Sequence, residues 1–184
     1  VFDGGAKIID VDSTSTFIGE QKIPEQIGGY PVTAIGDNAF KNCTELTGIT
    51  VPNSVNAIGY GAFYGCSKLE KISLPFVGNV RDNPKYNSGK SCFSYIFGDA
   101  VPSSTTKVII TDSVPIPKYA FYKCGNLTSV ILKGAVTSIG ERAFSDCTNL
   151  RGITIPDSVT YIANQAFWNC TGLTDITVPN SVTY

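Results

Sequence analysis

The stretch "IGDNAFKNCTELTGITVPNSV", residues 35–55, decides the fold because the chain spells it repeatedly. Close copies begin at Ile58, "IGYGAFYGCSKLEKISLPFV", and at Ile139, "IGERAFSDCTNLRGITIPDSV". Alignment on the central Ala-Phe pair gives intervals of 23, 58, 23 and 23 residues between the phenylalanines at positions 40, 63, 121, 144 and 167. A period of about 20 to 30 residues predicts a solenoid, in which each coil buries its apolar face against its neighbours.

The long interval of 58 residues, between Phe63 and Phe121, contains one additional coil whose sequence departs from the repeat. The run "VIITDSV", residues 108–114, matches "ITIPDSV", residues 153–159, and Phe97 fills the phenylalanine position upstream. Most of the excess lies in "PFVGNVRDNPKYNSGKS", residues 75–91, which is rich in turn-forming residues. We therefore expect a long loop, over about residues 78–104, that bulges from the solenoid.

These intervals divide one solenoid domain into four parts. Residues 1–31 are expected to form an N-terminal lead-in or capping half repeat, and residues 32–77 two regular repeats. Residues 78–113 form the irregular repeat with its loop. Residues 114–184 hold three repeats, of which the last is expected to run into a truncated end.

Within one coil the apolar spacing changes and so assigns structure. In the run from Leu46 the apolar residues Ile49 and Val51 alternate with polar ones, which is typical of a short strand with one face inward. Pro52 then ends the strand, because proline cannot donate a backbone hydrogen bond. A second short pair places Val55 and Ile58 across the coil, and the spacing of Gly-x-x-Ala-Phe-x-x-Cys matches one helical turn. The prediction is a β-rich α/β solenoid with a parallel concave sheet, short second strands and single helical turns.

Stacking of such coils aligns one phenylalanine from each. We expect an interior column of six rings, contributed by Phe40, Phe63, Phe97, Phe121, Phe144 and Phe167.

The full phrase I-P-x-S-V-x-x-I-G-x-x-A-F-x-x-C-x-x-L-x-x-I resembles the BspA-like class of leucine-rich repeats. That class occurs in surface proteins of gut and oral anaerobes, spirochaetes and some protozoa. The resemblance covers about residues 23–184, and "IPEQIGGYPVTAIG" is similar to the lead-in half repeat of the family. It implies a right-handed, curved solenoid that is exported to the cell surface for adhesion or ligand contact. The irregular coil at residues 78–113 departs from the pattern.

Composition argues against catalysis and against charge-driven partners. The chain has no histidine, which removes the commonest general base and metal ligand, and no motif brings a carboxylate pair together. With 14 basic and 15 acidic residues, nothing indicates capture of nucleic acid or of a membrane surface. No apolar run reaches the roughly 18 residues that span a bilayer. We therefore predict no enzyme activity, no cofactor, no metal, no nucleic-acid partner and no membrane insertion by this segment.

Five cysteines, at positions 43, 66, 124, 147 and 170, share one place in the repeat. Buried free thiols are the preferred interpretation, with disulfides between adjacent coils as the alternative. Cys92 fits that place less well.

The outward positions of the strands are free for a partner because packing does not use them. Most carry small or hydroxylated side chains, whereas Ile109 and Ile131 are apolar neighbours beside the long loop. We hypothesise a contact patch in which loop aromatics join these isoleucines and lysines form the rim, its members being Lys71, Lys107, Lys133, Ile109, Ile131, Phe76, Tyr86, Phe93 and Tyr95. The alternative is that the loop folds over the isoleucines and only repairs the irregular coil.

A second set of aromatic residues lies outside the phenylalanine column and could stack against sugars or cover the core edges: Tyr60, Tyr64, Tyr119, Tyr122, Tyr161 and Trp168. Charged residues make up only 16% of the chain, which suggests an extracellular surface. Together with the resemblance, this favours a monomeric, non-catalytic adhesion module that binds a protein or glycan ligand on a host or neighbouring cell. The alternative function is a passive spacer that presents another domain.

Overall fold

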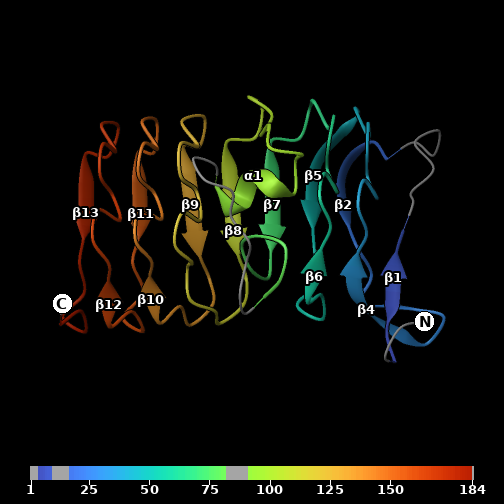
Figure 1. Cartoon of the computed structure of the whole chain (residues 1–184), viewed down its shortest axis with the longest axis horizontal. Helices are drawn as coiled ribbons and strands as arrows, with labels where there is room; N and C mark the ends of the chain where they lie inside the picture. The colour runs from blue at the N-terminus through green and yellow to red at the C-terminus, as the bar shows by residue number, and fades with distance from the viewer. Residues whose placement is uncertain (1–3, 10–16, 82–90, 184) are drawn as a thin grey trace.

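The computed structural model describes residues 4–9, 17–81 and 91–183, and they form a solenoid of parallel strands (Figure 1). Seven strands, one from each turn, make the large sheet: β2 (Gly19–Lys22), β5 (Leu46–Thr50), β7 (Lys71–Leu74), β8 (Lys107–Ile110), β9 (Ser129–Leu132), β11 (Gly152–Thr154) and β13 (Asp175–Thr177). Each pairs in parallel with the next. The predicted solenoid with a parallel sheet is confirmed.

The strand register keeps one apolar row facing the interior. Ile49 pairs with Ile72, which pairs with Val108, and the row continues through Val130 and Ile153. All five of these side chains are buried. Because side chains alternate along a strand, the residues on either side of this row face outward.

A second column of short strands lies across each coil from the large sheet. At the N-terminal end β1 (Ala6–Ile8), β4 (Tyr30–Ile35) and β6 (Ala57–Ile58) pair in parallel, with β3 (Gln26–Ile27) antiparallel to β4. At the other end β10 (Ser138–Ile139) pairs with β12 (Tyr161–Ile162). At the irregular coil the direction reverses, since Val80 bridges Ala57 in antiparallel fashion.

The Ala-Phe-x-x-Cys segments are not helical turns, so that part of the prediction is wrong. In each of them the residue before Ala and the residue before Cys have left-handed backbones, as at Asn38 (φ 56°) and Asn42 (φ 61°). A left-handed residue ends a right-handed turn, although the spacing of the apolar residues is the same as in a helix. Within the described ranges the only α-helix is α1 (Cys92–Tyr95), in the irregular coil, and Ser91 caps its N-terminus.

The phenylalanine column is present and holds one ring more than expected. Successive ring centroids lie 5.1 to 6.1 Å apart in the order Phe40, Phe63, Phe97, Phe93, Phe121, Phe144, Phe167. Helix α1 supplies the extra ring, because Phe93 lies in the helix and Phe97 follows two residues after its end. Phe17 closes the N-terminal end by packing edge-on against Phe40, at 6.1 Å and 81°.

The repeated cysteine contacts the backbone of the preceding coil. The Sγ atoms of Cys66, Cys147 and Cys170 each donate to the carbonyl oxygen of a column phenylalanine, at 3.1, 3.1 and 3.0 Å. All six cysteines are free thiols in this structure. Burial raises the pKa of the Cys66 thiol to about 12. The position therefore selects a small, uncharged side chain that can donate weakly to a buried carbonyl.

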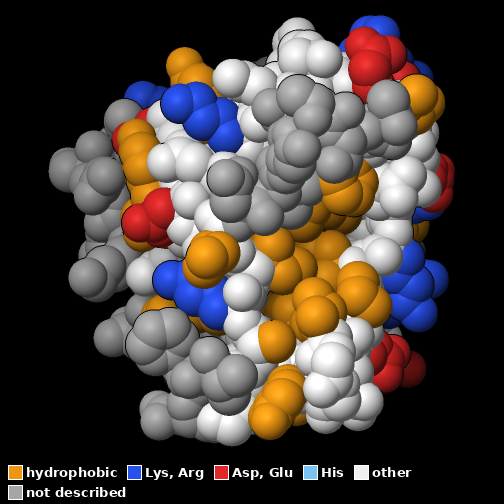
Figure 2. All heavy atoms as spheres, turned by 90° about the vertical axis from the view of Figure 1, so that its right-hand side faces the viewer, with side chains coloured by type: hydrophobic (Ala, Val, Ile, Leu, Met, Phe, Trp, Pro, Cys, Tyr) orange, Lys and Arg blue, Asp and Glu red, His pale blue; other side chains and the backbone are white. Residues whose placement is uncertain are grey.

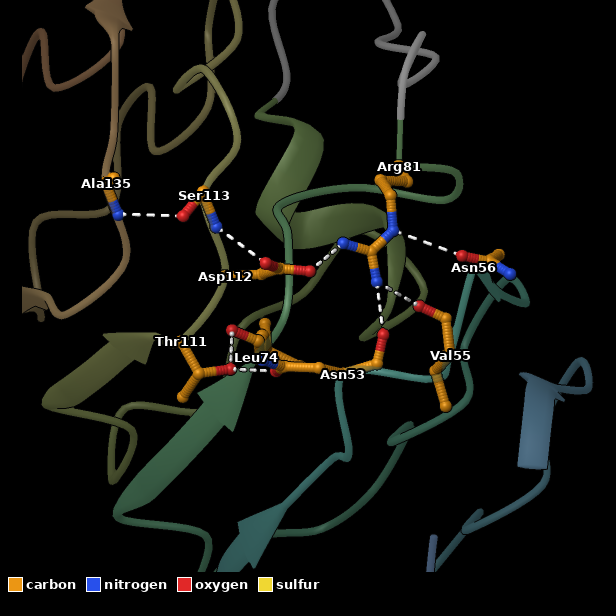
Figure 3. A network of polar contacts seen from close by, with 9 residues as sticks. All are labelled: Asn53, Val55, Asn56, Leu74, Arg81, Thr111, Asp112, Ser113 and Ala135. Carbon is orange, nitrogen blue, oxygen red and sulfur yellow. Dashed lines mark hydrogen bonds and ion pairs between the residues drawn. The ribbon is translucent and has the colours of Figure 1, made fainter. Parts of the chain in front are cut away.

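Arg81 follows β7 and ties this turn of the solenoid to the turns of β5 and β8 on either side (Figure 3). Its guanidinium forms an ion pair with Asp112 and lies 5.5 Å from the ring centroid of Phe76. The same group donates to three acceptors of the preceding turn, which are Asn53 O (2.5 Å), Val55 O (3.0 Å) and Asn56 Oδ1 (3.1 Å). Among the described residues no strand pair joins Val80 to Ile116, so side-chain bonds hold the coils together where the second column is interrupted.

Candidate functional site

The outward face of the large sheet presents two parallel rows of side chains. Register places Glu20, Gly48, Lys71, Lys107, Ser129, Gly152 and Asp175 in one row, and Lys22, Thr50, Ser73, Ile109, Ile131, Thr154 and Thr177 in the other. With about 4.8 Å between strands, each row is roughly 30 Å long. The face is therefore a continuous surface, in which Gly48, Ser73 and Ile109 are buried and the other members of the two rows are partly or fully exposed.

Lysines of adjacent strands occupy the middle of the first row. Lys71 lies beside Lys107 in the register, and its Nζ forms an ion pair with Glu20 at 3.0 Å. The lysine reaches across Gly48, where an added Cβ would lie 2.8 Å from the Cγ of Glu20. Lys107 makes no ion pair within the described part of the chain, so its charge is available to a ligand.

The two predicted isoleucines are neighbours in the second row. Ile109 pairs with Ile131 in the register of β8 and β9; Ile109 is 8% exposed and Ile131 is partly exposed. The structure thus brings together four of the predicted residues, Lys71, Lys107, Ile109 and Ile131, which we call the sheet patch. Lys133, predicted at the rim, is exposed at the end of β9.

The loop aromatics do not join the sheet patch as predicted. Phe76 and Phe93 belong to the core, with 1% and 0% of their surface exposed, so their expected exposure is wrong. Tyr95 is partly buried and packs edge-on against Tyr60 at 5.3 Å. Tyr86 lies outside the described residues. One signal in the sequence could have placed Phe93, because it precedes Phe97 by four residues, the spacing of side chains on one helical face.

A hollow on the same face extends from the sheet patch toward the C-terminal strands. It has a volume of about 610 Å³ and crosses β9, β11 and β13, and we call it the sheet groove. Ile131, Thr154 and Thr177 line it together with the charged Arg151 and Asp175. The hollow is open at its centre because a Cβ added to Gly152 would meet no atom within 4 Å. In the sequence Gly152 is one of several small residues at outward strand positions, and by itself it does not indicate a hollow.

The second aromatic set lies mostly along the row of Ala-Phe turns, which we call the turn edge. Tyr60, Tyr64, Tyr119, Tyr122 and Trp168 flank Ala-Phe pairs there, whereas Tyr161 lies in β12. Three lysines of this edge lie over tyrosine rings, at 5.7 Å for Lys41 on Tyr64 and 5.1 Å for both Lys118 on Tyr119 and Lys123 on Tyr122. A cationic group therefore lies over one face of each of these three rings.

Hydrophobic side chains also gather on the end of the solenoid that faces the viewer in Figure 2, on the N-terminal side. The large exposed ones in this part of the chain are Ile9 (70%), Ile18 (61%), Ile27 (47%) and Tyr30 (48%). This end shows the kind of apolar surface that consecutive coils bury against one another.

The described residues offer no arrangement for metal chemistry. No group of three or more His, Cys, Asp or Glu side chains among them is placed to hold an ion. A search of the same residues finds no helix with the length and apolarity needed to span a bilayer.

Comparison with protein families finds one match over most of the chain. The sequence pattern of the BspA type leucine rich repeat region matches in six copies, over residues 13–98 and 114–184. A comparison with curated proteins finds no match.

Solved structures of bacterial leucine-rich repeat proteins are similar to this chain. The leucine-rich repeat protein of T. pallidum is 26% identical, with 89% of this chain and 60% of that chain covered and a TM-score of 0.45. A protein from Bacteroides ovatus is 24% identical, with coverages of 99% and 51% and a TM-score of 0.48. A leucine-rich cell surface protein from Faecalibacterium prausnitzii is 25% identical, with coverages of 96% and 51% and a TM-score of 0.46. The chain thus spans between half and three fifths of these proteins.

Proposed function

Since this chain belongs to the family of BspA-type leucine-rich repeat proteins, we propose that it is a non-catalytic interaction module of the cell surface. Its partner is a protein or glycan of a host or neighbouring cell, and the extracellular location is part of the proposal. The low share of charged residues, 16%, fits a surface built from Thr, Ser, Asn and Gly.

The observation that carries the proposal is the outward face of the large sheet. Inward side chains such as Ile72 and Val108 are fully buried and are used in packing. The outward rows combine lysine charge, hydroxyl groups and a partly exposed isoleucine, a mixture suited to a contact surface with an apolar centre and a polar rim. The sheet patch and the sheet groove share Ile131, so one partner could cover both.

A charge introduced on this face tests the proposal. The purified chain, labelled with a fluorophore, is applied to epithelial cells and to immobilised matrix proteins and glycans. Replacing Ile131 with glutamate puts a charge at the junction of patch and groove, and we expect binding to fall at least about tenfold. Tyr161→Glu is the matched control, because Tyr161 is 48% exposed on β12, in the second column of strands.

The outcomes separate the module from a spacer. Loss of binding in Ile131→Glu, with retention in Tyr161→Glu, supports recognition by the sheet face. Equal binding by both variants would assign the contact to another surface. Absence of binding by the unmodified chain to every surface would favour a passive spacer.

A further inference from the structure

The turn edge contains a cleft between two aromatic side chains. Tyr122 and Trp168 occupy the same place in their coils, directly after a column phenylalanine, and they are two coils apart. The coil between them has Ser145 in this place. Because serine is small and its side chain is buried, with 1% of the residue exposed, the row of large side chains is interrupted there. The resulting turn-edge cleft has a volume of about 310 Å³.

The spacing of the coils sets the width of the cleft. The column rings beneath it follow one another at 5.2 Å (Phe121 to Phe144) and 5.1 Å (Phe144 to Phe167), so residues two coils apart are separated by roughly 10 Å. A flat ring in van der Waals contact with a wall on each side requires about 7 to 8 Å between the walls. The cleft therefore has room for one ring and not for two.

Hydrogen-bond donors and acceptors line the remaining sides of the cleft. The Nε of Arg142 donates to the Oε1 of Gln165 at 2.6 Å, which holds the guanidinium at the cleft. Within the described residues the terminal amino groups of Arg142 make no hydrogen bond, so they can donate to a ligand. Asp146 supplies carboxylate oxygens, one of which is held by Asn169 at 2.8 Å.

We propose that the turn-edge cleft binds one pyranose ring of a neutral glycan, stacked between Tyr122 and Trp168. A pyranose presents flat faces of C–H groups to the aromatic walls and a rim of hydroxyl groups that both donate and accept. Arg142 supplies donors for that rim and Asp146 supplies acceptors. The opposite charges of these two residues favour a ligand with no net charge.

A second cleft on the same edge shows what the proposed site requires. It has a volume of about 240 Å³ and is lined by Asn38, Lys41, Tyr60, Gly61, Tyr64 and Gly98. Its Tyr64 ring has the ammonium group of Lys41 over one face at 5.7 Å, just as Tyr122 has that of Lys123 over one face at 5.1 Å. The two clefts differ on the opposite side, where the second cleft has Gly98 and no aromatic side chain. The turn-edge cleft therefore differs in having an aromatic side chain from each of its two outer coils.

This inference is independent of the sheet face. The cleft lies at the Ala-Phe turns, whereas the sheet patch and sheet groove lie on the strands, so either site can fail without the other.

The position of the tryptophan allows a direct test. Trp168 is the single tryptophan of the chain and is 57% exposed, so its fluorescence reports on the cleft itself. The purified chain is titrated with five neutral disaccharides: lactose, N-acetyllactosamine, cellobiose, maltose and chitobiose. We expect a saturable change in emission with at least one of them. Calorimetry with the same sugar should then show at least about a tenfold loss of affinity in Tyr122→Ala and in Trp168→Ala.

A variant whose side chain fills the cleft provides a sharper test. Ser145→Tyr places in the gap a residue type that the equivalent positions of other coils already hold, at Tyr64 and Tyr122, so the coil retains its fold and the sugar loses its place. Tyr161→Ala removes an exposed aromatic residue away from the turn edge and should bind as the unmodified chain does.

Three results would overturn the proposal. The first is a failure of all five disaccharides to change the emission or produce binding heat. The second is tighter binding of sialic acid, arginine methyl ester or phenylalanine amide, which would assign the cleft to a charged or aromatic ligand. The third is sugar binding that survives Ser145→Tyr in a chain whose circular dichroism is unchanged.

Discussion

Replacing Phe144 with alanine tests the aromatic column at its most regular point. Phe144 is fully buried, and its ring stacks on Phe121 at 5.2 Å and 16° and on Phe167 at 5.1 Å and 1°. Alanine at this position leaves a ring-sized gap between two rings that are held apart by the coil backbones. Because the strand spacing is fixed by hydrogen bonds on either side, the coils cannot close that gap.

The magnitude follows from the buried area. A buried phenylalanine side chain removes about 150 to 200 Å² from water, which at about 25 cal/mol per Å² amounts to ~4 to 5 kcal/mol. Core Phe→Ala substitutions cost about 3 to 5 kcal/mol in measured series. We therefore expect a loss of about 3 to 5 kcal/mol and a fall in Tm of about 10 °C, since 1 kcal/mol corresponds to roughly 2 to 4 °C in a chain of this size.

Urea and thermal unfolding measured by circular dichroism and by tryptophan fluorescence provide the assay. Trp168 follows Phe167 directly, so its emission reports on the coil next to the gap. In a solenoid each coil is stabilised by its neighbours, and the fluorescence transition of the variant should come before the transition in circular dichroism. Tyr161→Ala, which removes an exposed ring, is the control. A loss below about 1 kcal/mol in Phe144→Ala would refute the column as a main source of stability.

Three further predictions concern the turns, the irregular coil and the thiols. Gly65→Ala should lower the urea midpoint, because Gly65 has φ 74° and a Cβ there would lie 2.2 Å from an asparagine oxygen of the preceding coil, whereas Gly152→Ala should not. Burial acts to raise the pKa of Asp112, but a hydrogen bond from the next backbone amide and the pairing with Arg81 lower it overall. A lowered folded-state pKa stabilises the fold above the ordinary carboxyl pKa, so stability is lost as pH falls below about 4, and urea midpoints at pH 7 and pH 3 should differ less in Asp112→Asn. Iodoacetamide at pH 8 should modify the partly exposed Cys170 before the buried thiols, and mass spectrometry that finds disulfides instead would contradict the hydrogen-bonded thiols.

The repeated part of the fold could be predicted because its inward residues have fixed chemistry. Alternation places Ile49 and Ile72 inward, and the 23-residue period aligns the column phenylalanines. The turn conformation could not be predicted in this way, since left-handed residues such as Asn38 leave the apolar spacing unchanged. Strand β2 could not be predicted, because Gln21 stands where the next strand has Ile49 and so breaks the apolar pattern.

The candidate site was likewise predictable only where it follows the repeat. The sheet patch could be placed from the sequence because register follows from the repeat, which fixes Lys71 beside Lys107. The loop aromatics could not be placed, since the insertion has no period and α1 turns Phe93 into the column. The turn-edge cleft depends on a missing side chain at Ser145, and a pattern search directed at large residues does not detect it.

The interrupted second column gives the solenoid an uneven resistance to bending. The large sheet is continuous from β2 to β13, whereas across the coil the described strands have no pair between Val80 and Ile116. Along one edge the coils are joined by a hydrogen-bond ladder, and along the other edge at this point they are joined by the side chain of Arg81. A lateral force on one end of the molecule should therefore open the solenoid at the Arg81–Asp112 pair first, with the large sheet serving as the hinge.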